Sequence, residues 1–203
     1  MSTRRDFLVS AGLTAGGLAL AGLAVPRRPS AAPRPIDIKP VDITMMSDPL
    51  GTTVWFDPIG ILVPPGSTVR WTVHANVHTT AAYHPRNDHH SLRIPEKAEP
   101  WDSKFLVNPG DHFSVTLTVP GVYDYFCAPH EAAGMVGRIV VGTPSGPGTL
   151  PFDYFRGRPG TDAWVPVPPA ARKAFPSVSQ IMRARVVRRT LPPAPPASSS
   201  PRG

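Results

Sequence analysis

The chain has 203 residues, enough for one modest domain with tails, and its 28 prolines argue that part of it does not pack into a core. The net charge of +7 comes from the two ends, because residues 36–144 carry 7 basic and 11 acidic side chains. A mildly acidic central segment in which aromatic and basic residues do not alternate argues against a nucleic-acid-binding protein.

Residues 1–32 have the features of an export signal. Arg4 and Arg5 precede residues 7–25, an uncharged stretch rich in Gly and Ala. The paired arginines resemble a twin-arginine (Tat) signal, which implies export to the periplasm or another extracytoplasmic space. The alternative is a membrane anchor left by an uncleaved signal, because these 19 uncharged residues approach the roughly 20 that span a bilayer.

The central residues 36–144 predict a small all-β domain. Short runs of alternating apolar and polar residues are separated by Pro-Gly turns, and we find no sustained helical period. One apolar face per strand indicates sheets packed face to face, as in an antiparallel Greek-key β-sandwich or barrel. The polar segment 83–105 is expected to be a long irregular loop. The predicted strands are residues 41–46, 52–57, 60–66, 68–77, 79–84, 112–119, 121–127 and 137–142.

Three metal-binding side chains lie close together near the end of this domain. Cys127 is the single cysteine of the chain, so an intramolecular disulfide is impossible. It is followed by His130 and Met135, which places a thiolate, an imidazole and a thioether in one loop between two predicted strands. Thiolate and thioether suit Cu(I), and a site of two histidines and a cysteine with a weak axial methionine is the blue-copper arrangement. Such a site requires one more histidine.

Residues 127–137, CAPHEAAGMVG, resemble the ligand loop of plastocyanin and its bacterial relatives, the cupredoxins, in their C-x2-H-x4-M spacing. The resemblance covers roughly residues 52–142 and implies a cupredoxin-like fold. In that family another histidine lies on an upstream loop, and His78, seven residues after Trp71, is close to the usual interval. His74 and His84 are the alternatives. The resemblance thus implies one copper ion held by His78, Cys127, His130 and Met135.

The resemblance also implies a role. A type 1 (blue) copper protein carries single electrons between redox proteins, which are expected to dock near His130. Four protein ligands leave no open position for a substrate, so we predict that the chain is not an enzyme. A copper-buffering or delivery protein is the alternative, and a second metal held by His84, His89 and His90 is a further hypothesis. His89, His90 and His112 are otherwise expected to be solvated. Thr79 stands where plastocyanins usually have Asn, so the hydrogen bonds around the site are expected to differ.

Residues 145–190 form a basic C-terminal extension. Pro176 is expected to begin one short helix that reaches about Arg189, with apolar residues at helical intervals. The aromatic residues of the extension predict that it packs back on the β-domain, and the alternative is a basic surface that contacts an anionic membrane or an acidic partner. Residues 191–203 are rich in Pro and Ser and are predicted to be disordered. We expect a monomer.

Overall fold

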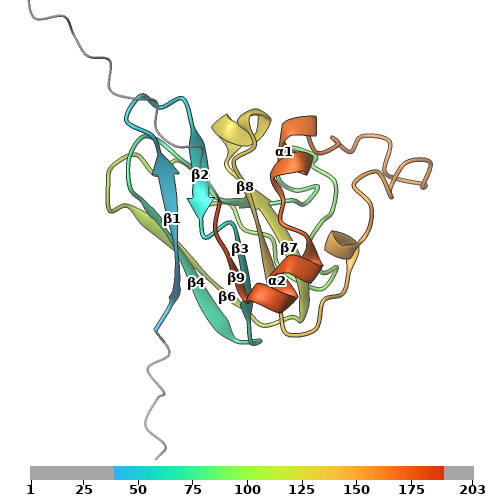
Figure 1. Ribbon diagram of the computed structural model, residues 1–203. Coiled ribbons are helices and arrows are strands. Elements are labelled where there is room, and N and C mark those ends of the chain that lie inside the picture. The colour runs from blue at the N-terminus through green and yellow to red at the C-terminus, as the bar shows by residue number, and fades with distance from the viewer. Residues whose placement is uncertain (1–38, 190–203) are drawn as a thin grey trace, which may run out of the picture. The chain divides into compact units, whose positions relative to one another are not determined.

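The computed structural model describes residues 39–189, which form a sandwich of two sheets with the extension packed against one of them (Figure 1). The first sheet, in the order β2–β1–β4–β6, consists of β1 (Val41–Ser47), β2 (Val54–Asp57), β4 (Ser67–Val73) and β6 (His112–Leu117). The second, in the order β5–β7–β8–β3–β9, consists of β3 (Gly60–Val63), β5 (Ala81–Ala82), β7 (Gly121–Phe126), β8 (Val136–Val141) and β9 (Val186–Val187). The predicted signal at 1–32 and the predicted tail at 191–203 lie outside the described residues.

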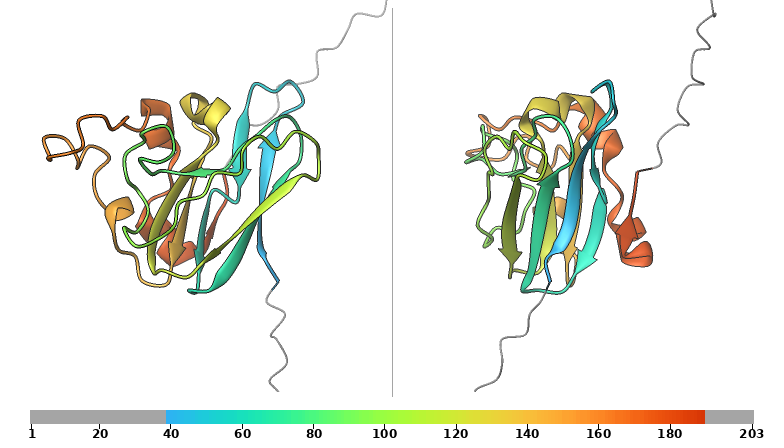
Figure 2. Two further views of the ribbon diagram at one scale, coloured as in Figure 1. Left: turned by 180° about the vertical axis from the view of Figure 1, so that it is seen from behind. Right: turned by 90° about the vertical axis from the view of Figure 1, so that its left-hand side faces the viewer.

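The core fills the space between the two layers, which lie side by side in the left view of Figure 2. Along β4 every second side chain is buried, as the alternating sequence predicted. Trp71 at the centre of β4 packs against Trp101 and Tyr125, with ring centres 5.4 and 5.2 Å apart. Trp101 comes from the long segment 83–105, which forms no strand, as expected, but contributes several buried side chains.

The prediction of an all-β sandwich is confirmed, with one correction to the strand pairing. β1 pairs with β4 and β3 pairs with β8 in parallel, so both sheets are mixed rather than antiparallel. An alternating apolar pattern buries one face of a strand in either direction and therefore does not distinguish the two pairings.

The extension contains more regular structure than the sequence indicated. It includes α1 (Pro169–Ala174), α2 (Val178–Ala184) and β9, which pairs with β3. The predicted helix begins later because Ser177 and Gln180 form a capping box, in which each side chain accepts a hydrogen bond from the other's backbone N–H. It ends earlier because Arg185 adopts a φ of 61°. Neither helix, nor any other within residues 39–189, is long and apolar enough to cross a membrane.

A buried group of three charges joins the extension to the second sheet. Asp124 on β7 accepts hydrogen bonds from Arg93 Nε at 2.7 Å and from Arg138 Nε at 2.6 Å. Arg93 also donates to the carbonyl oxygens of Gly148 and Leu150, which belong to the extension. Because the extension covers the outer face of this sheet, every residue of β7 and β8 is buried.

Candidate metal centre

One tight loop positions the thiol, the second imidazole and the thioether. Cys127 follows β7, the 3-10 turn η1 (Ala128–Ala133) carries His130, and Met135 precedes β8. The backbone N–H of Cys127 donates to the Met135 carbonyl at 3.0 Å, and the Met135 N–H donates to the His130 carbonyl at 3.1 Å. Gly134 completes the turn with a φ of 85°, a conformation that favours glycine. The loop thus holds its first and last candidate ligands together, and both side chains are fully buried.

His78 reaches the same place from the loop between β4 and β5. Its backbone exchanges two hydrogen bonds with Leu106, at 3.1 and 2.9 Å, which fix this loop. Its Nδ1 lies 3.7 Å from the sulfur of Cys127, and the Nδ1 of His130 lies 3.4 Å from the same sulfur. The ligand atoms of these three residues all lie within 4.8 Å of one another.

The hydrogen bonds of His78 determine which of its ring nitrogens has a free lone pair directed at the sulfur of Cys127. Its Nε2 lies 2.8 Å from the carbonyl oxygen of Ala75 and 3.2 Å from the hydroxyl of Ser47. A carbonyl oxygen only accepts, so Nε2 carries the proton and Nδ1 is free to coordinate a metal. This is the usual orientation of a ligand histidine by a partner on its other nitrogen.

The pocket keeps the imidazoles neutral and disfavours a lone thiolate. Burial, and then the charge of His130, lower the pKa of His78 to about 4, and burial lowers the pKa of His130. Burial raises the pKa of the Cys127 thiol to about 11, although hydrogen bonding from Thr79 opposes this shift. A bound cation would supply the charge that stabilises the thiolate. Two neutral imidazoles, a thiol and a thioether therefore fit copper.

Thr79 supports the thiol through two contacts. Its backbone N–H donates to Cys127 Sγ at 3.3 Å, and its side-chain hydroxyl accepts from the Ala128 N–H at 2.7 Å. Thr79, which stands where plastocyanins usually have Asn, therefore connects the loop of His78 to the loop of Cys127.

The other histidines lie elsewhere. His74 and His89 are exposed, and His84 Nδ1 accepts a hydrogen bond from the Arg86 N–H. Among the described residues, His78, Cys127 and His130 form the single convergent group of three His, Cys, Asp or Glu side chains, so the hypothesis of a second metal at His84, His89 and His90 is not supported. The expectation of a solvated His90 is wrong, because its side chain is buried against Phe126 and Glu131.

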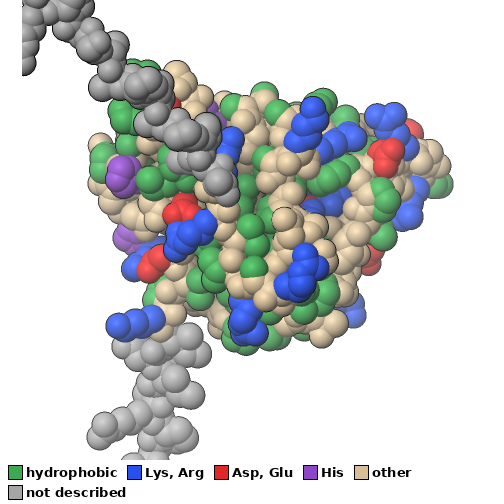
Figure 3. All heavy atoms as spheres, in the orientation of Figure 1, with side chains coloured by type: hydrophobic (Ala, Val, Ile, Leu, Met, Phe, Trp, Pro, Cys, Tyr) green, Lys and Arg blue, Asp and Glu red, His purple; other side chains and the backbone are tan. Residues whose placement is uncertain are grey.

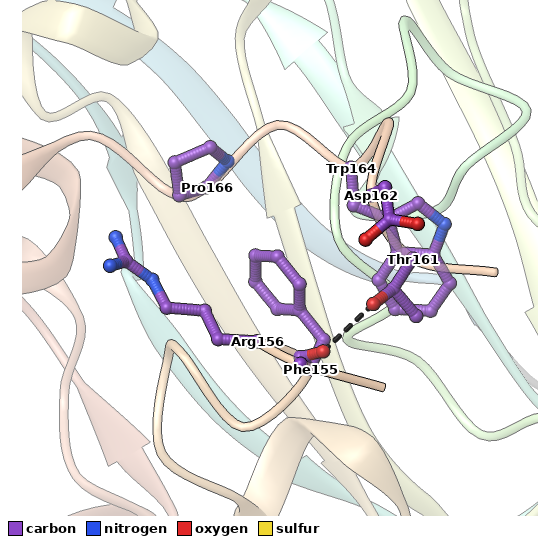
Figure 4. A pocket seen from close by; sticks show the side chains of 7 residues that line it. Phe155, Arg156, Thr161, Asp162, Trp164 and Pro166 are labelled. Atoms are coloured by element: carbon purple, nitrogen blue, oxygen red, sulfur yellow. Dashed lines mark hydrogen bonds between the residues drawn. The ribbon is translucent and has the colours of Figure 1, made fainter. Parts of the chain in front are cut away.

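A hollow of about 320 Å³ in the extension is separate from this centre (Figure 4). It lies between Phe155, Arg156 and Pro166 on one side and Thr161, Asp162 and Trp164 on the other, and the Thr161 hydroxyl donates to the Phe155 carbonyl at 2.8 Å. None of the four candidate ligands lines it.

Comparison with known proteins agrees with this geometry. Residues 44–142 match the family described as copper binding proteins, plastocyanin/azurin family. A chloroplastic plastocyanin of Hordeum vulgare is 58% identical over 38 residues, which is 19% of this chain and 24% of that protein. The matches span 24 to 40% of the length of such curated relatives.

Two solved structures extend the comparison. A pseudoazurin from Sinorhizobium is 34% identical over 52% of this chain and 75% of that chain, with a TM-score of 0.41. A copper-containing nitrite reductase from Thermus scotoductus is 23% identical over 53% of this chain and 23% of that chain, with a TM-score of 0.39. Residues 44–142 therefore belong to the plastocyanin/azurin family of copper-binding proteins. Copper is accordingly the cofactor of this chain.

Proposed function

We propose that this chain carries single electrons with one copper ion held by His78, Cys127, His130 and Met135. The observation that carries the proposal is the convergence of one thiol and two neutral imidazoles beside a buried thioether, in a loop closed by its own backbone hydrogen bonds. Copper would supply a one-electron Cu(I)/Cu(II) couple there. The protein contributes rigidity, because ligands from two tied loops move little between the two states.

Electron transfer accounts for the site better than catalysis does. Four protein ligands would complete the coordination, whereas copper catalysis needs a position open to substrate or water. Copper delivery would favour exposed, exchangeable ligands, but Cys127 and Met135 are fully buried. An electron carrier is therefore favoured over an enzyme and over a copper-delivery protein.

His130 is the natural exit for the electron. It is the partly exposed ligand, and four small apolar side chains surround it on the loop, those of Ala128, Pro129, Ala132 and Ala133. Such a surface suits brief docking of a redox partner, because an apolar patch without charge pairs binds and releases readily.

The extension adds a basic surface to the protein. Lys and Arg side chains are scattered over the face shown in Figure 3, which carries fewer acidic ones. Lys173, Arg183, Arg185 and Arg188 of the extension are exposed. This positive charge would attract the protein to an acidic partner or to an anionic membrane. In this proposal the protein acts outside the cytoplasm, as a monomer, after export by its N-terminal signal.

Voltammetry of the copper-loaded protein tests the role. A carrier gives a reversible one-electron wave and retains its metal through many cycles. If the reduced protein instead gives up its copper readily to a moderate Cu(I) chelator, the delivery function is favoured. Steady consumption of nitrite or oxygen by the loaded protein would contradict the proposal in favour of an enzyme.

A further inference from the structure

The extension contacts the ligand loop directly at its second half. Helix α1 and the 3-10 turn η1 lie side by side at one end of the sandwich (Figures 1 and 2). A Cβ placed on Gly134 would lie 3.3 Å from the Ala170 carbonyl oxygen and 3.5 Å from the Ala174 side chain. Gly134 immediately precedes Met135, so the backbone before the thioether is confined by α1.

The first half of the loop is fixed from another direction. Glu131, next to His130, accepts a hydrogen bond from the Tyr83 hydroxyl at 2.5 Å and lies 3.0 Å from His90 Nε2. His90 is stacked on Phe126, the residue before Cys127, with ring centres 4.3 Å apart. Both carboxylate oxygens of Glu131 are therefore engaged by buried side chains.

The extension also holds His90. The Val165 N–H donates to the His89 carbonyl at 2.8 Å, and the Val165 carbonyl accepts from the Ser91 N–H at 3.1 Å. These two hydrogen bonds involve the residues on either side of His90, so they fix the backbone that carries it. The extension thus reaches the ligand loop twice, through His90 at Glu131 and through α1 at Gly134.

A shared apolar cluster joins these contacts. Tyr83, Phe126 and Val136 are buried with Val167 and Ala171 of the extension, and Phe175 packs against them. Phe126 and Val136 directly flank the segment from Cys127 to Met135, so the strand ends that carry the loop are anchored by the extension.

We propose that the extension is a structural part of the copper centre. In this proposal the extension, Tyr83 and His90 together position His130 and Met135. We call their contacts with the ligand loop, at Glu131, at Gly134 and in the shared apolar cluster, the loop clamp. The inference rests on the proposed electron-transfer site. Its consequence is that the ligand geometry, and with it the spectrum and reduction potential of copper, depends on residues that do not touch the metal.

One pair of variants tests the Glu131 side of the loop clamp. Tyr83→Phe removes the hydroxyl that holds Glu131 and keeps the ring. Tyr123→Phe is the matched control, because its hydroxyl donates to the Val119 carbonyl at 2.7 Å, near the start of β7 and far along the strand from Cys127. We expect Tyr83→Phe to shift the visible thiolate-to-copper band and the reduction potential, and Tyr123→Phe to leave both at the parent's values.

A second pair tests the extension. Phe175→Ala weakens the packing of the extension beside the ligand loop. Ile181→Ala weakens the packing of the extension against Val122 and Val140, at the other end of β7 and β8. We expect the first variant alone to alter the copper spectrum and potential. Parent-like values in both Tyr83→Phe and Phe175→Ala, or equal shifts in the controls, would overturn the proposal.

Amide hydrogen exchange in the copper-free protein tests the loop clamp without relying on bound metal. We expect residues 128–134 to exchange on the order of fivefold faster in Tyr83→Phe than in Tyr123→Phe, because one buried hydrogen bond is lost at the loop. Unchanged exchange would contradict the loop clamp. A parent protein that binds copper without the visible band would contradict the proposed function instead, and the exchange comparison would still decide the clamp.

Discussion

The backbone N–H of Thr79 lies 3.3 Å from the sulfur of Cys127 and donates a hydrogen bond to it. The Thr79 hydroxyl meanwhile accepts from Ala128, the residue after the cysteine. Thr79 therefore links the two loops that carry the proposed ligands, and its side chain and its backbone can be tested separately.

Removing the Thr79 hydroxyl should loosen this link. Thr79→Ala leaves the Ala128 N–H without its partner, and we expect a loss of about 1 kcal/mol in the free energy of unfolding. Thr79→Ser keeps the acceptor and should lose less. Guanidinium titrations of the copper-free proteins measure the difference, and equal stability of the Ala and Ser variants would show that the hydroxyl contributes nothing.

The charge of Asp124 should be essential to the fold. Asp124→Asn leaves the buried Arg93 and Arg138 facing a neutral partner, so we expect a loss of about 3–5 kcal/mol in the free energy of unfolding. The control is Asp42→Asn, because Asp42 pairs with Arg70 at the surface and such pairs contribute about 0–1 kcal/mol. Similar losses in the two variants would contradict this assignment.

The contact of His90 with Glu131 should make stability depend on pH. Burial by itself lowers the pKa of His90, but the hydrogen bond and charge of Glu131 outweigh it and raise the pKa above the usual 6.5. A pKa raised by folding stabilises the protein fully below pH 6.5, and this contribution disappears as the pH rises through the folded value. We expect the stability difference between the parent and His90→Gln to shrink with rising pH.

Urea titrations at a series of pH values measure that difference in the copper-free proteins. His112→Gln is the control, because His112 is exposed at the start of β6. A difference for His90→Gln that stays constant or grows with pH would refute the expectation.

His78 and His74 should differ sharply in their effect on the metal. His78 Nδ1 lies 3.7 Å from Cys127 Sγ, whereas His74 is exposed at the end of β4. We expect His78→Ala to abolish the visible copper band and His74→Ala to retain it, as recorded by absorption spectra at equal copper loading. The reverse result would assign the ligand to His74.

The strands could be predicted because alternation records which side chains face the core, and all eight strands expected in residues 41–142 are present. Their parallel partners could not be predicted, since pairing in a mixed sheet depends on contacts far apart in the sequence. The six-residue α1 was missed because a helix this short is stabilised by its packing on the ligand loop rather than by its own sequence pattern.

The candidate ligands could be predicted from their spacing in the sequence, but the residues that hold them in place could not. Asp124 lies inside the apolar run of β7 and pairs in register with Arg138 of β8, an opposite charge at the matching position that could have indicated a buried ion pair. His90 gave no such indication, because a histidine in a polar loop has the same sequence context whether or not distant residues cover it. Its burial depends on Phe126 and Val165.

The most direct test of a type 1 copper site is an absorption spectrum of the copper-loaded protein beside its Cys127→Ser variant. Copper content is measured in both samples so that loading is known. We expect an intense visible thiolate-to-copper band in the parent and its complete loss in the variant. A fully loaded parent without that band, or a variant that retains it, would contradict the proposed role of Cys127 and with it the electron-transfer site.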